Sequence, residues 1–158
     1  HHASKDQLWR CREVGKLEVR PASQRDVEKL SDLCAQLGYP SAVEDVATRL
    51  GRISGRPDHC LLVAEIDGEV VGWAHVCEAL TLESGACAVL AGLVVDEGHR
   101  SRGVGAQLLR AAEEWARRQG YGRIIVRSNV VRERAHRFYE RQGYTLVKTS
   151  RVFERRLE

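Results

Sequence analysis

The chain has 158 residues, of which 43% are hydrophobic and 30% charged, and its net charge is +3. This length indicates one domain with its own core, and apolar runs such as residues 86–95 are too short to span a bilayer. The arginines are spread along the sequence, which does not favour a nucleic-acid-binding protein, since basic residues there gather on one face. The mild positive charge is compatible with an anionic cofactor.

The N-terminal residues and the cysteines set the expected boundaries and the cellular compartment. Residues 1–16 show no periodicity and begin with His1-His2, so they are interpreted as a tag remnant and irregular leader before a domain at 17–158. The histidines lack ligand spacing, so no metal is expected. An odd number of cysteines without a CxxC pair favours free thiols in a reducing compartment and therefore a cytoplasmic location; they are Cys11, Cys34, Cys60, Cys77 and Cys87.

The first half of the domain is predicted to contain a strand followed by two helices. Alternation predicts a strand at 17–21. A capping box from Ser23 to Asp26 begins a helix that Gly38 ends, and a second capping box from Ser41 to Glu44 begins the next helix.

The second half alternates strands and helices. Strands are predicted at 60–66 and 69–78, joined by an Asp67-Gly68 hairpin turn, and at 86–95, 123–127 and 144–153, with helices at 103–119 and 132–142. The order β-α-α-β-β-β-α-β-α-β predicts a single-domain α/β fold with a mixed central sheet and helices on both faces. Residues 86–127 form one right-handed βαβ unit, so ligands are expected beyond the end of its first strand.

The segment that follows this strand is suited to an anion. Backbone N–H groups in the first turn of a helix lack intrahelical partners, and the helix dipole adds partial positive charge there. The alternative is a tight turn that needs glycine. The segment lacks the spacing of a P-loop or a dinucleotide fingerprint, and it comprises Arg100, Ser101, Arg102, Gly103, Val104, Gly105 and Ala106.

Two blocks of sequence together carry a family resemblance. Leu-Val-Val-Asp at 93–96 followed by Arg100-x-x-Gly-x-Gly105 is similar to the acetyl-CoA signature of the GCN5-related N-acetyltransferase (GNAT) family. Asn129 and the run Ala-His-Arg-Phe-Tyr-Glu-Arg-Gln-Gly-Tyr at 135–144 resemble its second signature. The resemblance covers residues 17–153 and implies an acetyl-CoA-dependent N-acetyltransferase with the GNAT fold.

The resemblance also implies roles for individual residues. The backbone of Leu93, Val94 and Val95 is expected to pair with the pantetheine arm, and the amides of residues 100–106 to bind the pyrophosphate. Asn129 is expected to contact the cofactor, although it could equally be a helix cap. Ala135 and Phe138 are expected beside the cofactor arm, with packing in the core as the alternative for Phe138. Tyr139 is expected to face the sulfur.

The chemistry requires an acid and a base. A primary amine has a pKa of about 10, so its proton must leave before it attacks the thioester. Tyr139 is the candidate acid for the departing thiolate. The strand glutamate that many relatives place before the Leu-Val-Val stretch is missing, which leaves His75, Glu78 or a water chain as candidate bases. Each side chain could instead be purely structural.

The acceptor is left open between several amines. Motif similarity is strongest to bacterial small-molecule acetyltransferases, including aminoglycoside 6'-N-acetyltransferases and aminoalkylphosphonate acetyltransferases. A polycationic aminoglycoside would need acidic residues, for which Glu44, Asp45, Glu78 and Glu83 are candidates. A peptide or protein N-terminus and a non-catalytic acyl-CoA-binding domain are the alternatives. No membrane or nucleic-acid partner is expected, and residues 145–153 could pair two copies into a homodimer.

Overall fold

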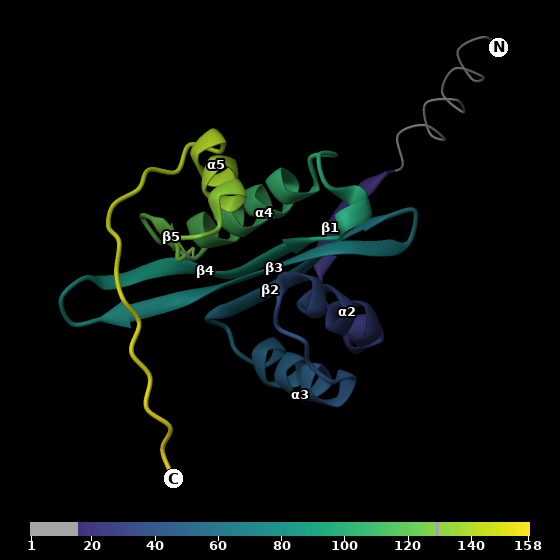
Figure 1. The fold of residues 1–158 in the computed structure, drawn as a ribbon, viewed down its shortest axis with the longest axis horizontal. Helices are drawn as coiled ribbons and strands as arrows, with labels where there is room; N and C mark the ends of the chain where they lie inside the picture. Colours follow the sequence, from purple (N-terminus) through teal and green to yellow (C-terminus); the bar gives the residue numbers. More distant parts are fainter. Residues whose placement is uncertain (1–15, 129) are drawn as a thin grey trace. The chain divides into compact units, whose positions relative to one another are not determined.

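A computed structural model describes residues 16–128 and 130–158 and contains one mixed sheet. Its order is β1-β2-β3-β4-β5, with antiparallel pairing from β1 to β4 and parallel pairing of β4 with β5. Figure 1 shows these strands, which are β1 (Leu17–Pro21), β2 (His59–Ile66), β3 (Glu69–Thr81), β4 (Gly85–Val95) and β5 (Ile124–Val126).

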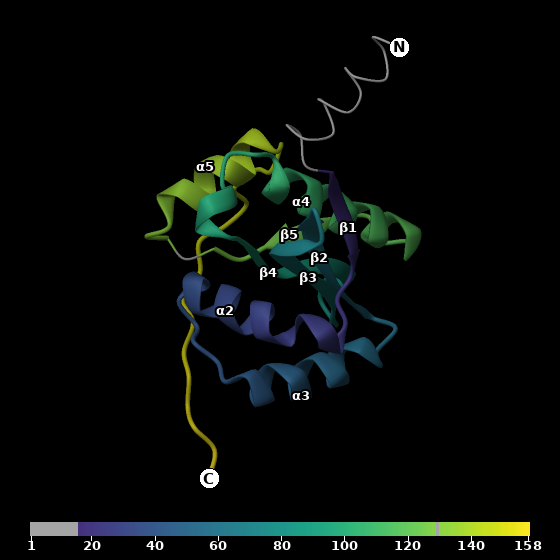
Figure 2. The same cartoon turned by 90° about the vertical axis from the view of Figure 1, so that its right-hand side faces the viewer.

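Helices cover both faces of the sheet, as predicted. The pair α2 (Val27–Leu37) and α3 (Val43–Ser54) lies on one face, and α4 (Val104–Arg118) lies on the other (Figures 1 and 2). Short 3₁₀ turns, η1 (Gln24–Asp26) and η2 (Glu97–His99), precede α2 and follow β4. Within the described residues, no helix is both long and apolar enough to cross a membrane.

The two faces are packed by different sets of apolar side chains. Leu30, Leu33, Val46 and Leu50 from α2 and α3 form a buried cluster with Val63 of β2. On the other face, Val104, Leu108 and Leu109 of α4 are almost completely buried. Gly72 lies directly beneath α4, because a Cβ there would stand 3.1 Å from Leu108 Cδ1 and 2.8 Å from the Val94 carbonyl oxygen.

The local start and stop signals were mostly correct. Asp67 and Gly68 have φ of +51° and +83° and form the expected hairpin turn. The Ser23 N–H donates to the Asp26 carboxylate at 2.9 Å, as the first capping box requires.

The second capping box was wrong. The N-cap of α3 is Ala42, with no side-chain capping bond. The Ser41 hydroxyl lies one residue too early and donates to the Tyr39 carbonyl at 3.1 Å instead.

The chain divides into two compact units, His1–Val126 and Arg127–Glu158. In the second unit α5 (Glu133–Arg141) is followed by Gly143 at φ +92°. The predicted strand at 144–153 was wrong, since these residues have no regular structure. A strand needs a neighbouring edge and a buried face, and apolar side chains of this segment are instead 79–90% exposed: Leu146, Val147, Val152 and Phe153. The homodimer stays a prediction, now without a formed strand to mediate it.

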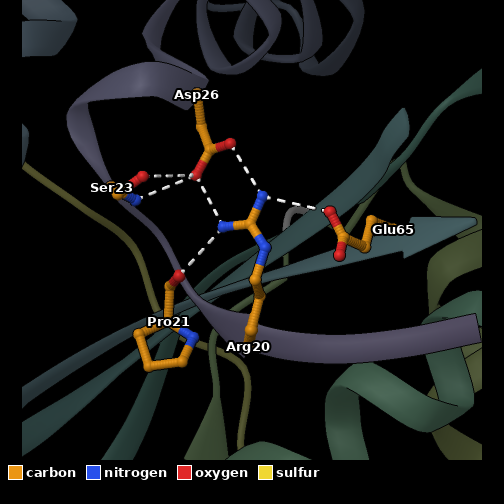
Figure 3. Close-up of polar contacts among 5 residues, drawn as sticks. All are labelled: Arg20, Pro21, Ser23, Asp26 and Glu65. Atoms are coloured by element: carbon orange, nitrogen blue, oxygen red, sulfur yellow. Dashed lines mark hydrogen bonds and ion pairs between the residues drawn. The ribbon is translucent and has the colours of Figure 1, made fainter. Parts of the chain in front are cut away.

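A buried ion pair joins β1 to the start of α2 and to β2 (Figure 3). Arg20 donates to both oxygens of Asp26, at 2.9 Å each, and to Glu65 at 3.2 Å. Asp26 is the only buried charged residue in the described part of the chain, with 5% of its surface exposed. The hydrogen bonds from Arg20, and then the one from Ser23, hold the pKa of Asp26 below its ordinary value despite burial.

Replacing Arg20 by methionine should therefore destabilise the protein. The buried Asp26 carboxylate would lose its cation, which costs about 3 kcal/mol in comparable pairs. The matched control is Lys16→Met, which removes an exposed ion pair with Glu18 (3.1 Å) and should change stability by less than about 0.5 kcal/mol. Urea unfolding at pH 7 measures the loss of stability in both variants. Equal losses would contradict the conclusion that Arg20 compensates a buried charge.

The contribution of this pair should also depend on pH. Because the pKa of Asp26 is lowered in the folded state, its stabilisation is complete above the ordinary aspartate pKa of about 3.9. It is lost as the pH falls through the lower folded value. The stability difference between wild type and Arg20→Met should thus shrink below pH of about 4; a constant difference down to strong acid would contradict this origin.

Candidate active site

The edge of β4 that faces β5 is paired over only part of its length. Parallel pairing joins Ala88–Leu90 to Ile124–Val126 and then stops. Among the described residues, no strand continues along this edge to Val95. An unpaired strand edge offers N–H and C=O groups to an extended ligand that carries amides.

A β-bulge sets which backbone groups face this open edge. Gly92 pairs with His75 and Leu90 with Val76, so the intervening Ala91 has no partner in β3. The Ala88 N–H points toward β5 and donates to the Arg123 carbonyl at 3.1 Å. Backbone N–H and C=O groups point alternately to the two edges of a strand, and one extra residue reverses this alternation for the residues that follow it.

The reversed alternation directs Leu93 and Val95 outward. The Asp96 N–H donates to the Val71 carbonyl at 2.8 Å, on the β3 side. Since backbone groups alternate with a period of two, Val94 also faces β3, while the N–H and C=O groups of Leu93 and Val95 face the open edge. Of the three residues expected to pair with the cofactor arm, Leu93 and Val95 therefore have the orientation that such pairing needs, whereas the backbone groups of Val94 are turned toward β3.

Side-chain hydrogen bonds hold the segment after β4 against α2. The Gln36 amide donates to the Asp96 carboxylate at 2.8 Å, and its carbonyl accepts from the Glu97 N–H at 3.0 Å. His99 Nδ1 contacts the other Asp96 oxygen at 2.9 Å. The hydrogen bonds from Gln36 and then from His99 lower the pKa of Asp96, so its carboxylate stays ionised at neutral pH.

The loop from 100 to 106 has the backbone of an anion-binding nest. Ser101 and Gly103 flank Arg102 and have positive φ angles of +68° and +80°. Positive φ is uncommon for a residue other than glycine, so Ser101 marks a backbone shape that the loop specifically requires. The first bond of α4 runs from the Gln107 N–H to the Gly103 carbonyl at 3.1 Å. The amides of Val104, Gly105 and Ala106 precede that bond and are left for a ligand.

The charges around this loop favour an anion. Arg100 and Arg102 are exposed, and the first turn of α4 contains no acidic residue. Val104 is 1% exposed and anchors the turn in the core. The arrangement combines a helix dipole, free amides and two guanidinium groups, which together suit a diphosphate.

The remaining residues that the family resemblance assigns to the cofactor belong to the second unit of the chain. Ala135, Phe138 and Tyr139 of α5 are half-buried, whereas Asn129 lies outside the described residues. The Tyr139 ring contacts those of Phe138 and Tyr144, with centroids 5.2 Å and 5.8 Å apart. Burial raises the pKa of Tyr139, with a smaller opposing effect from Arg132, so its hydroxyl remains protonated at neutral pH.

The two candidate bases occupy different positions along β3. His75 lies opposite Gly92, next to the open part of β4, and burial followed by the nearby His59 lowers its pKa to about 4. Glu78 lies opposite Ala88, where β4 is still paired with β5. Burial and then the charge of Glu78 raise the pKa of Tyr121.

The acidic residues expected to bind a cationic substrate are not gathered in one place. Glu44 and Asp45 lie in the first turn of α3, and Glu83 lies in the turn between β3 and β4. All three are exposed.

Sequence reasoning missed two features of this region. Gln36 was expected only as a helix residue, because nothing in its spacing links it to residue 96. The neighbourhood of His59, His75 and Cys77 was also missed, because folding about Asp67-Gly68 alone places residue 59 opposite residue 76, and only the register shift between Ala64 and Glu65 brings it opposite residue 77.

Comparisons with known proteins agree with this geometry. The family model described as "Acetyltransferase (GNAT) family" matches residues 25–144. The chain belongs to the GNAT family. The matched region makes up most of the predicted domain at 17–158.

The curated relatives differ in how much of their own length this chain matches. The aminoglycoside N(6')-acetyltransferase type 1 of Klebsiella aerogenes is 30% identical over 147 residues, which cover 88% of this chain and 96% of that protein. Two other curated relatives are matched over only 41% and 22% of their own lengths.

Solved structures share the fold. The crystal structure of a transcriptional regulator from Bacillus halodurans C-125 has a TM-score of 0.78 at 26% identity, covering 88% of this chain and 99% of that one. The aminoglycoside N-acetyltransferase AAC(6')-Iy in complex with CoA has a TM-score of 0.81 at 18% identity, covering 90% and 97%, and this likeness concerns the fold alone.

Replacing Gln36 by leucine tests how the GNAT loop is held. The loss of two hydrogen bonds to residues 96 and 97 should loosen the phosphate loop and raise the Kd for CoA about tenfold, equivalent to about 1.4 kcal/mol. The control is Gln24→Leu, which removes a 3.0 Å bond to the Ala47 carbonyl elsewhere on the molecule. Isothermal calorimetry with CoA distinguishes them, and an unchanged Kd for Gln36→Leu would contradict the positioning role.

Proposed function

We propose that the protein transfers the acetyl group of acetyl-CoA to a primary amine of a small molecule, with an aminoglycoside as the first candidate. The observation that carries this proposal is the open edge of β4, which leads directly into the nest loop at the start of α4. An amide-bearing arm and a diphosphate are joined in the same order in CoA.

The cofactor would be held mainly by backbone groups. Leu93 and Val95 would exchange hydrogen bonds with the pantetheine amides, and the amides of residues 104–106 would bind the pyrophosphate. Arg100 and Arg102 would add charge on the solvent side. Asn129, Ala135 and Phe138 complete the proposed set through the family resemblance.

The chemical step needs the amine neutral and the thiolate protonated. We assign the acid to Tyr139, whose hydroxyl keeps its proton at neutral pH because burial raises its pKa. Neither candidate base is well matched to its task. A histidine with a pKa of about 4 is a weak acceptor for an ammonium proton, and Glu78 lies opposite Ala88, where β4 is still paired with β5. We therefore propose that water carries the amine proton to solvent.

The acceptor proposal rests on the relative from Klebsiella aerogenes, whose name gives the 6'-amine of aminoglycosides as its target. The separation of Glu44 from Glu83 argues against a single acidic cluster, so an aminoglycoside would contact them one at a time. Peptide N-termini and aminoalkylphosphonates are the other acceptors. A cytoplasmic setting belongs to the proposal, supported by the free thiols of Cys34, Cys60 and Cys87.

A thiol-release assay with acetyl-CoA and a panel of amines tests the proposal. The panel contains kanamycin-type aminoglycosides, aminoalkylphosphonates and peptides with free N-termini. Turnover with the aminoglycosides at the highest kcat/KM is the expected result. Higher kcat/KM for a peptide or phosphonate would replace the acceptor, and CoA binding without turnover of any amine would favour the non-catalytic alternative.

The variant Tyr139→Phe tests the acid. Its kcat should fall by about a hundredfold while the Kd for CoA changes little, because the ring remains and only the proton donor is lost. Tyr39→Phe, at a tyrosine that is 71% exposed, is the matched control and should behave as wild type. An undiminished kcat for Tyr139→Phe would reject the assignment.

A further inference from the structure

Three side chains on one face of the β2–β3 hairpin form a cluster that the acyl-transfer chemistry does not use. His59 of β2 lies opposite Cys77 of β3, and His75 precedes Cys77 by two residues. Residues at this spacing point to the same side of a sheet. The shared face is the one that carries Trp73 and packs against α2 and α3 further along.

The ligand atoms of these side chains are already close together. One imidazole nitrogen from each histidine and the Cys77 sulfur all lie within 4.8 Å of one another. His59 Nδ1 and His75 Nε2 are 2.9 Å apart, and the two rings are stacked with centroids 5.1 Å apart. Two histidines and a cysteine therefore converge on one point.

This geometry is near that of a tetrahedral metal site. Zinc binds imidazole nitrogen at about 2.0–2.1 Å and thiolate sulfur at about 2.3 Å, so its ligand atoms stand about 3.3–3.6 Å apart. The two nitrogens need to separate by only about 0.5 Å from their hydrogen-bonded contact to reach that spacing. The Cys77 sulfur, which lies within 4.8 Å of both nitrogens, would need to approach them by up to about 1.2 Å, and rotation of the side chains would supply both changes.

We propose that His59, His75 and Cys77 form a binding site for a divalent transition-metal ion, with Zn²⁺ as the ion that fits best. Two imidazoles and a thiolate suit Zn²⁺ and exclude Mg²⁺ and Ca²⁺, which take oxygen ligands. All three residues are half-buried, so solvent reaches the site and a water molecule can occupy the fourth position.

The binding step is balanced by loss of one proton. Zn²⁺ replaces the hydrogen bond between the two imidazoles, and the Cys77 thiol gives its proton to the buffer as the zinc–sulfur bond forms. Asp58 directly precedes His59 in the sequence. Asp58 itself is paired with Arg56 at 3.3 Å and is not counted as a ligand.

The site is independent of the proposed function. Metal binding is measured in the absence of acetyl-CoA and amine, so its failure would leave the acetyltransferase proposal standing. The reverse also holds, because none of the three ligands belongs to the proposed catalytic set. His1 and His2 are present in every variant, so any ion that they hold is common to all.

Cobalt and zinc titrations of the chelator-treated full chain test the site. With Co²⁺, wild type should develop a thiolate-to-cobalt charge-transfer band, and Zn²⁺ should abolish it at one equivalent. Cys77→Ser should lose the band and bind Zn²⁺ about a hundredfold more weakly in competition with a chromophoric chelator. The matched control is Cys60→Ser, which removes a half-buried cysteine of the neighbouring strand β2 that is not part of the cluster and should behave as wild type.

His59→Gln provides a second variant whose fold is checked by circular dichroism without metal. Because Cys77 is still present, this variant should show a weakened thiolate-to-cobalt charge-transfer band. Its affinity for Zn²⁺ should fall about a hundredfold, as for Cys77→Ser. Absence of the band in wild type, or equal Zn²⁺ affinity in wild type, Cys77→Ser and His59→Gln, would overturn the proposal.

Discussion

A single extra residue in β4 determines which backbone groups the molecule offers to a cofactor. Up to Leu90 the strand uses its outer edge to pair with β5. The bulge at Ala91 then reverses the alternation, and Leu93 and Val95 face an edge that no described strand occupies. The polar groups on this edge need partners, and the proposed binding of an extended amide-bearing arm would supply them. The open edge is therefore a consequence of strand register, and it requires no particular side chain.

The loop after this strand depends on contacts made far away in the sequence. Gln36 of α2 bonds both the side chain of residue 96 and the backbone of residue 97, and so joins the helical layer to the end of β4. The left-handed residues Ser101 and Gly103 then turn the chain into α4 with free amides at its start. The open edge of β4, the segment held by Gln36 and the loop at 100–106 follow one another along the chain. Their order matches the covalent order of pantetheine and pyrophosphate in CoA.

Much of the fold was predictable because its signals are local. The Asp67-Gly68 turn, the helix stops and the apolar β4 strand depend on neighbouring residues alone. The strand expected at 144–153 failed because alternation specifies a face without supplying something to bury it. Gln36 and the cluster of His59 with His75 and Cys77 depend on register between distant segments, which a single sequence does not encode locally. Counting back from the hairpin turn pairs residue 59 with residue 76, and the register shift between Ala64 and Glu65, which no local signal announces, moves the partner to residue 77.

Residue-specific amide hydrogen exchange by NMR, with and without CoA, tests the central claim most directly. The Val94 amide faces β3 and should exchange slowly in both states, whereas Leu93 and Val95 should exchange quickly when free and become protected when CoA binds. The amides of residues 104–106 should gain protection in the same titration. Bound CoA that leaves the exchange of Leu93 and Val95 unchanged would contradict the account, because the open edge of β4 would then not be where the cofactor lies.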